Sequence, residues 1–198
     1  MEEGKEMLFW TKEEYLKFAG VMMDKPLSFY AFEMLYWCGI REGELLALTP
    51  TDFDFENRTV TINKSYQRLK RKDVVTVPKT KKSNRLIKIQ QFLADEMKDC
   101  FKLFYSLKAN DRIFPVTKHY LHHEMDRGSK AAGVKRIPIH SLRHTFATAL
   151  LEADVDIRYI QEMLGHSSIT ITEIYTHVAT AKQRDILATK HPRKNFKI

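Results

Sequence analysis

Five side chains of this sequence carry the chemistry needed to attack a phosphodiester. They are two arginines, two histidines and one tyrosine: Arg41, His140, Arg143, His166 and Tyr175. A guanidinium presents a rigid fork of donors that matches two phosphate oxygens, which lysine cannot reproduce. A tyrosine hydroxyl has a pKa of about 10, so it attacks only where its site stabilises the phenolate or removes the proton. The set therefore indicates covalent attack by Tyr175 on a phosphate that arginines hold.

These residues also have ordinary structural interpretations. A tyrosine is more commonly a half-buried packing residue, and a His-x-x-Arg spacing by itself is a weak signal. His144 follows His140 by four residues, a spacing that can hold zinc on a helix, but the glutamate of the HExxH pattern is missing. Asp52 and Asp54 alternate as at a turn and strand start, unlike the carboxylates of a two-metal nuclease. We therefore predict that the site holds no metal.

The positive charge of the chain is concentrated in one segment. The net charge is +8, yet ten basic residues stand between Lys64 and Lys88 with a single acid, Asp73, so this segment carries +9 and the remainder −1. A neutral body with one basic arm is typical of a polyanion-binding protein. A solvated hairpin that only aids solubility is the alternative. The residues expected to contact the polyanion are Lys64, Arg68, Lys70, Arg71, Lys72, Lys81, Lys82 and Arg85.

Length and composition predict a single compact domain. The chain has 198 residues, of which 43% are hydrophobic, enough to bury a core. No stretch has the length and apolar character of a signal peptide or a membrane span. Cys38 and Cys100 both stand among apolar neighbours, so we interpret them as reduced core thiols of a cytoplasmic protein.

The hydrophobic pattern predicts an α+β fold that is mostly α-helical. Thr11 and Glu14 form a capping box before the first helix, Pro26 begins a second helix, and Gly39 ends it. Further helices are expected over residues 43–48, 92–107, 118–131, 141–153, 157–164, 169–175 and 181–190. Alternating, β-branched runs over 58–62, 68–77 and 85–89, with turn residues at Asp73 and 83–84, predict a three-stranded antiparallel sheet.

The helix over 141–153 would place two of the five residues together. With Ser141 as its N-cap, an apolar stripe faces the core, formed by Leu142, Phe146, Ala149, Leu150 and Ala153. His140 and Arg143 then share another face at the helix N-terminus. Free backbone N–H groups and the positive end of the helix dipole favour a phosphate there.

Four ordered sequence boxes carry a family resemblance. CGIREGELLAL, HSLRHTFAT, LGHSS and IYTHV resemble the boxes of the tyrosine recombinases, the phage-integrase class of site-specific DNA recombinases. PKTKKSNRLIKI resembles the basic β-hairpin box of that family. The resemblance extends from about Leu8 to about Asp185, nearly the whole chain, and four boxes in order are far more specific than any one of them.

The resemblance assigns a role to each residue that matches a box. It implies that Tyr175 attacks the scissile phosphorus, leaving a 3′-phosphotyrosyl link and a free 5′-hydroxyl, without metal, nucleotide or other cofactor. Glu44 would support the site, and Lys79 would protonate the leaving oxygen, with Lys81 as its rival for that role. The remaining matched residues are Arg41 as the first catalytic arginine, His140 and Arg143 as the central pair, and His166 at a position that holds histidine or tryptophan.

The resemblance also implies partners and a domain organisation. The partner would be double-stranded DNA of a phage or mobile element, with a homotetramer on DNA for a full-length protein and a monomer for this chain. An accessory protein could set the direction of recombination. Residues 1–198 would be one catalytic domain whose segment 181–198 docks on a neighbouring protomer. No N-terminal core-binding domain precedes Leu8, so we expect an excised domain or a minimal integrase.

Two other function classes compete with this interpretation. Residues 157–175, with Gly165 at a turn, resemble a helix-turn-helix, so the chain could be a non-catalytic DNA-binding regulator. Such a regulator would have no reason to gather Arg41, His140, Arg143, His166 and Tyr175 in one pocket. A metal-dependent nuclease is the third class, and it is disfavoured because carboxylates are not clustered.

Overall fold

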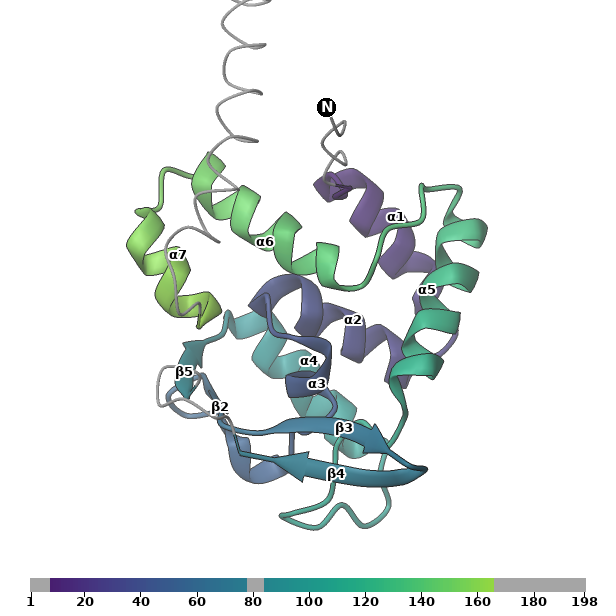
Figure 1. The fold of residues 1–198 in the computed structure, drawn as a ribbon, viewed down its shortest axis with the longest axis vertical. Helices are drawn as coiled ribbons and strands as arrows, with labels where there is room; N and C mark the ends of the chain where they lie inside the picture. The colour runs from purple at the N-terminus through teal and green to yellow at the C-terminus, as the bar shows by residue number, and fades with distance from the viewer. Residues whose placement is uncertain (1–7, 78–83, 166–198) are drawn as a thin grey trace, which may run out of the picture.

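The computed structural model describes residues 8–77 and 84–165 of the chain (Figure 1). Within them helices dominate, and a three-stranded antiparallel sheet lies beside a separate β-hairpin. In chain order the elements are α1 (Lys12–Met22), α2 (Pro26–Cys38), α3 (Glu42–Leu45), the 3-10 helix η1 (Pro50–Asp52), β1 (Phe53–Asp54), β2 (Thr59–Ile62), β3 (Ser65–Leu69), β4 (Lys72–Thr76), β5 (Arg85–Lys88), α4 (Gln91–Lys102), α5 (Lys118–Ala132), α6 (His140–Glu152) and α7 (Ile157–Leu164). The predicted fold class is confirmed. The helices expected over 169–175 and 181–190 lie outside the described residues.

Local signals set the ends of the first two helices as predicted. The Glu14 backbone N–H donates to Thr11 Oγ1 at 3.2 Å, and the Thr11 N–H donates to Glu14 Oε2 at 2.8 Å, which completes the capping box. Pro26 is the first residue of α2. Proline has no backbone N–H, and this costs nothing here because the first N–H groups of a helix have no acceptor within the helix. Gly39 ends α2 in the left-handed region, with φ of +58°.

Gly39 also lets α2 end against two later helices. A Cβ atom at this position would lie 2.4 Å from Phe146 Cδ1 of α6 and 3.0 Å from Leu164 Cδ2 of α7. The backbone conformation and the close approach therefore both require glycine here.

The sheet differs from its prediction in one strand. The three-stranded sheet has the order β1-β2-β5, so the short strand Phe53–Asp54 takes the place expected for residues 68–77. Those residues instead belong to the β3–β4 hairpin, whose turn is Lys70-Arg71 with φ of +47° and +66°. Positive φ at both central residues matches the right-handed twist of a hairpin, although glycine and asparagine are the residues usual there. Asp73, predicted as a turn residue, lies in β4 opposite Arg68.

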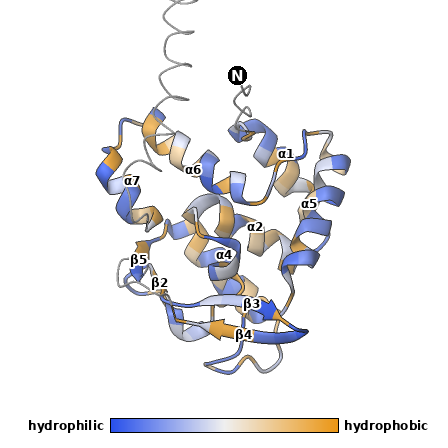
Figure 2. Cartoon of the chain, in the orientation of Figure 1, coloured by the Kyte–Doolittle hydropathy of each residue, from blue (hydrophilic) through white to orange (hydrophobic). Residues whose placement is uncertain are grey.

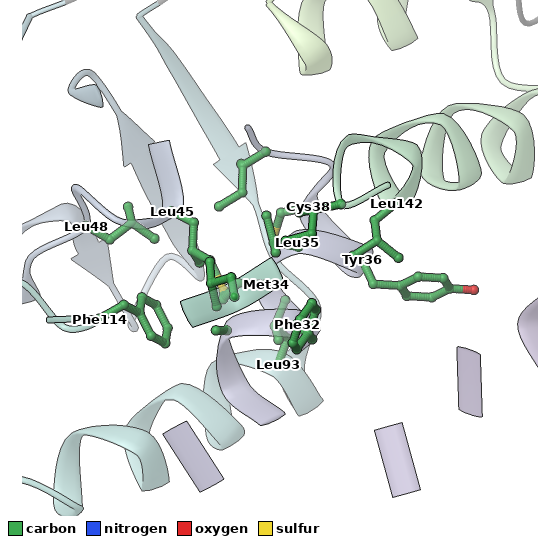
Figure 3. Packing of buried hydrophobic residues seen from close by; sticks show 14 of the residues in the cluster. Phe32, Met34, Leu35, Tyr36, Cys38, Leu45, Leu48, Leu93, Phe114 and Leu142 are labelled. Carbon is green, nitrogen blue, oxygen red and sulfur yellow. The ribbon is translucent and has the colours of Figure 1, made fainter. Parts of the chain in front are cut away.

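The main core surrounds α2 (Figure 3). Phe32 and Leu35 of α2 belong to a buried cluster that includes Leu93 of α4 and Leu142 of α6. Figure 2 shows the same division by hydropathy, since α2 is largely apolar whereas much of α5 is hydrophilic. Cys38 and Cys100 are buried and unpaired, as predicted for core thiols. Among the described helices, none is long and apolar enough to cross a membrane.

α6 buries the predicted apolar stripe only in part, since Phe146 and Leu150 pack against a second apolar cluster, and it buries polar residues as well. The helix begins at His140, and Ser141 is a buried first-turn residue instead of an N-cap. Leu142 is buried as expected, but Ala149 and Ala153 are exposed. The buried face consists of Ser141, Leu142, Arg143, Thr145, Ala147 and Thr148. Polar side chains are accepted on this face because they find partners there: Thr145 Oγ1, for example, donates to the Ser141 carbonyl at 3.0 Å and accepts from the Trp10 N–H at 3.3 Å.

α4 differs from its prediction, whereas α7 agrees with it. α4 ends at Lys102, several residues before the predicted end at 107. α7 has the predicted bounds and packs on α6 through a small second cluster of Ala147, Ile160 and Leu164.

Candidate active site

Arg41, His140 and Arg143 line one cleft of about 400 Å³. Arg41 is the N-cap of α3, His140 is the first residue of α6, and Arg143 follows one turn later. The full lining is Ile40, Arg41, Glu42, Gly43, Ser65, Lys118, Ile139, His140, Arg143 and His144. Gly43 allows α3 to approach β3, because a Cβ atom there would lie 2.6 Å from Ser65 Oγ and 3.0 Å from the Tyr66 carbonyl oxygen. Residues from four separate parts of the sequence thus meet at one place.

Glu44 holds the Arg41 side chain at the cleft. Arg41 Nη1 donates to Glu44 Oε1 at 2.9 Å, and the Arg41 backbone N–H donates to Glu44 Oε2 at 2.8 Å. The Arg41 side chain remains 46% exposed, so its guanidinium can still meet a ligand, whereas the Glu44 side chain is 7% exposed. This geometry agrees with the supporting role that the resemblance implies for Glu44.

Glu44 is itself held by Arg85. Arg85 Nη1 and Nη2 donate to the two Glu44 carboxylate oxygens at 3.0 and 2.8 Å. Burial by itself would raise the pKa of Glu44, but the hydrogen bonds and charges of Arg85 and Arg41 outweigh it and lower the pKa below its usual value. Glu44 is therefore ionised at neutral pH.

The placement of Arg85 corrects one prediction. Arg85 was expected among the residues that contact a polyanion, but its side chain is 5% exposed and its fork binds Glu44. Its Nε also donates to the Met163 carbonyl of α7 at 2.8 Å. Lys64 also makes internal contacts, because its ammonium is 2.7 Å from Asp52 Oδ2 and donates to Thr49 Oγ1 at 2.8 Å, while its side chain remains 25% exposed. Both side chains serve internal contacts.

Arg143 is buried at the back of the cleft. Its Nη1 donates to the Gly39 carbonyl at 2.7 Å, and its Nη2 donates to the Leu164 carbonyl. These carbonyls belong to the C-terminal ends of α2 and α7, where the last carbonyls of a helix have no N–H partner within the helix itself. Arg143 therefore joins two helix ends while its side chain lines the cleft.

The two histidines of the cleft differ in environment. His140 is exposed at the N-terminus of α6, and its ring lies 5.4 Å from the ring of His144 in an edge-on arrangement. Burial, helped by the nearby His140 and Arg143, lowers the pKa of His144 to about 4. His144 is thus neutral at pH 7. In the part of the chain that the structure describes, no three histidine, cysteine or acidic side chains gather as metal ligands would.

The basic hairpin starts at the cleft, because Ser65, the first residue of β3, lines it. Lys70, Arg71 and Lys72 are exposed at and after the β3–β4 turn, and Arg68 is half exposed with Asp73 Oδ1 at 3.6 Å. The base of the hairpin is fixed by Tyr66, whose hydroxyl donates to Asp73 at 2.8 Å and whose ring lies 4.2 Å from the Arg112 guanidinium carbon. The other predicted site residues lie outside the described residues: Lys79, Lys81, Lys82, His166 and Tyr175.

Sequence reasoning missed three residues of the cleft. Glu42 and Lys118 line it, and the Lys118 charge opposes the effect of burial, which raises the pKa of Glu42. His144 was considered only as a metal ligand. Thr117 signals a helix start by capping α5, which places Lys118 at its first position, but no spacing in the sequence connects α5 to Arg41.

Comparison with known proteins agrees with this geometry. The chain matches the phage integrase family over residues 9–182. It is 39% identical over 165 residues to a tyrosine recombinase of Agathobacter rectalis, an alignment that covers 83% of this chain and 52% of that protein. The chain spans about half the length of the curated relatives that it matches.

Solved structures share the fold. The Tn1549 transposon integrase in complex with a circular intermediate DNA aligns with a TM-score of 0.78 and 22% identity, covering 94% of this chain and 68% of that one. The catalytic domain of bacteriophage HP1 integrase aligns with a TM-score of 0.63 and 20% identity, covering 96% of this chain and 98% of that one. With the family match extending over most of its length, and with the boxes that hold Arg41 and the pair His140 and Arg143 meeting in one cleft, the chain belongs to the phage integrase family.

Proposed function

We propose that this chain is the catalytic domain of a site-specific DNA recombinase that cuts and rejoins duplex DNA through Tyr175. The observation that carries the proposal is the single cleft that Arg41, His140 and Arg143 line, although Arg41 is distant from the other two in the sequence. A binding module without chemistry has no need of such a group. Membership of the phage integrase family supports the same reaction class.

The proposed reaction is a transesterification. The phenolic oxygen of Tyr175 forms a bond to the scissile phosphorus while the bond from phosphorus to the 5′-oxygen breaks. Tyr175 loses its proton, and Lys79 supplies a proton to the leaving 5′-oxygen. Arg41, Arg143 and His166 stabilise the charge that develops on the non-bridging oxygens. A 5′-hydroxyl of the partner DNA then reverses these steps.

The rigid part of the site suits this reaction. Glu44 fixes Arg41 before any substrate arrives, so the enzyme does not have to order that side chain during the reaction. His140 assists proton transfer or holds the phosphate from the first turn of α6. His144 stays neutral beside it, which leaves the cationic character of the cleft to Arg41, Arg143 and Lys118.

Double-stranded DNA is the proposed substrate. The Tn1549 transposon integrase, which shares the fold, was solved with DNA, and Lys70, Arg71 and Lys72 supply exposed positive charge on the hairpin whose first residue, Ser65, lines the cleft. Assembly of four protomers on DNA and an accessory directionality protein remain predictions.

A covalent trap tests the proposal. The chain is incubated in EDTA with a library of duplex DNA that carries a nick beside a randomised segment, so that a cleaved strand diffuses away and the protein stays attached. We expect a protein–DNA band that resists denaturation, its loss in Tyr175→Phe, and its retention in Tyr105→Phe, which changes a fully exposed tyrosine of the loop after α4. A covalent band in Tyr175→Phe would refute the nucleophile, and strand cleavage that requires a divalent metal and leaves no covalent band would favour a nuclease.

A further inference from the structure

Arg85 connects three elements that meet behind the cleft. It is the first residue of β5, its two terminal nitrogens bind the Glu44 carboxylate of α3, and its Nε binds the Met163 carbonyl near the end of α7. Its side chain is 5% exposed, so protein covers nearly all of its surface. Three of its N–H groups therefore serve internal acceptors on two elements other than its own strand.

The same carboxylate fixes Arg41. Glu44 Oε1 accepts from the guanidinium groups of both Arg41 and Arg85, and Oε2 accepts from the Arg41 backbone N–H and from Arg85. Because two bonds from Arg85 prevent the carboxylate from rotating, they also set the direction in which it presents its oxygens to Arg41. Lysine could not do this, since its single nitrogen cannot bind two oxygens side by side and a third acceptor on α7.

The bond from Arg85 to α7 lies next to a bond that Arg143 of the cleft makes to the same helix. Arg85 holds the Met163 carbonyl, and Arg143 of the cleft holds the Leu164 carbonyl next to it. The C-terminal end of α7 is thus held by two guanidinium groups, and Gly165, which precedes His166 in the sequence, ends the helix.

We propose that Arg85 is a positioning residue for DNA cleavage: it orients Arg41 through Glu44 and fixes the end of α7 relative to the cleft. This inference rests on the proposed function, because it assumes that the cleft receives the scissile phosphate. Arg85 itself touches no substrate.

The test compares single-turnover formation of the covalent complex at saturating DNA, using the nicked library. Arg85→Lys keeps the charge but loses the fork, and we expect the rate to fall about 100-fold, the typical effect of misplacing a reacting group by about 1 Å. DNA affinity should stay within about threefold of the unaltered chain. The matched control is Arg127→Lys in α5, where another arginine fork binds the fully buried Glu124 at 2.9 and 3.0 Å. The control should leave the rate unchanged.

A double substitution separates positioning from folding. Arg85→Met with Glu44→Leu replaces the buried ion pair by apolar side chains, a change that is often neutral or stabilising. We expect the double variant to have a thermal stability near that of the unaltered chain. Its cleavage should still be slow, because the carboxylate that orients Arg41 is gone. Recovery of cleavage together with stability would overturn the proposal, since Arg85 would then have served only the fold.

A measurement without DNA decides the question even if the chain forms no covalent complex. Nuclear magnetic resonance of the ¹⁵N-labelled full chain reports whether the Arg41 guanidinium rotates freely, with Arg41→Lys used to assign its signals. We expect resolved Nη signals that merge in Arg85→Lys and persist in Arg127→Lys. Unchanged Arg41 signals in Arg85→Lys would refute the positioning role. An unaltered chain without covalent complex refutes the proposed function instead.

Discussion

Arg143→Lys is expected to destabilise the folded protein by about 1–3 kcal/mol. Arg143 donates to two buried carbonyls, of Gly39 and Leu164, through two different nitrogens. Lysine is shorter and ends in a single nitrogen, so it can satisfy only one of them. A buried acceptor that loses its partner costs about 1–3 kcal/mol. For a chain of this size that corresponds to a fall in Tm of roughly 2–12 °C.

Two further variants bracket the value. Arg143→Met leaves both carbonyls without a donor, so the loss in the free energy of unfolding should be about twice as large, roughly 2–6 kcal/mol. Arg158→Lys changes an exposed arginine of α7 and should stay within about 0.5 kcal/mol of the unaltered chain. Urea unfolding followed by circular dichroism measures all three variants.

The same variant separates the two tasks of Arg143. If the guanidinium also binds the scissile phosphate, Arg143→Lys fails to form the covalent complex even at a temperature where it is fully folded. Near-normal cleavage would contradict bidentate phosphate binding. An unchanged midpoint of unfolding would show that the two carbonyl contacts do not hold α2 and α7 together, and the reasoning from buried acceptors would be wrong.

Three other perturbations follow from the structure. Gly39→Ala should lower the free energy of unfolding, measured by urea unfolding, by about 2–5 kcal/mol. The left-handed φ costs alanine about 1–2 kcal/mol, and overpacking against its neighbours costs about 1–3 kcal/mol. Burial, aided by Glu33 and Asp99, raises the pKa of Glu96 to about 7, so the folded state binds this proton more tightly and stability falls between pH 4.5 and about 7. Glu96→Gln should lessen that fall in urea unfolding at pH 5 and pH 8. Replacing the exposed hairpin residues by glutamine should lower the salt slope of DNA binding by roughly 0.9 for each phosphate that they neutralise, with Lys70, Arg71 and Lys72 changed together.

Each of these has a matched control. Gly20→Ala lies in α1, where an added Cβ meets nothing within 4 Å, and should not destabilise the protein. Glu56→Gln changes an exposed glutamate and should leave the pH dependence as it is. Glutamine at three exposed lysines outside the hairpin, Lys12, Lys102 and Lys130, should leave the salt slope unchanged. The first prediction fails if Gly39→Ala is as stable as the unaltered chain. The second fails if Glu96→Gln and the unaltered chain lose the same stability between pH 5 and pH 8, and the third fails if the hairpin variant and its control have the same salt slope.

The sequence was most informative where local chemistry decides the structure. The capping box at Thr11 and the left-handed end at Gly39 lie in the residues themselves, and both predictions are confirmed. The turn at Lys70-Arg71 was missed because neither residue favours a positive φ. Tertiary contacts of Tyr66 and Asp73 with Arg112 fix the hairpin instead.

The contacts around the cleft could be predicted from the sequence only in part. The boxes named Arg41, His140 and Arg143, and the fold brings all three together. The charge count could not distinguish Arg85 from its exposed neighbours, because its partners Glu44 and Met163 lie far away in the sequence. The burial of Arg143 was missed for a similar reason: α6 accepts polar groups on its inner face once other helix ends supply carbonyl acceptors.

The attachment of α7 has a consequence for the order in which the molecule opens. α7 is attached through a cluster with three fully buried apolar side chains, two of them its own, and through guanidinium bonds to its last two carbonyls, whereas α2 lies in the main core. Segments with few buried apolar contacts open at a lower free energy than the whole molecule does. α7 therefore forms a weak cooperative unit whose amide hydrogens exchange ahead of those of α2, and an anion that kept Arg143 in place would slow that exchange.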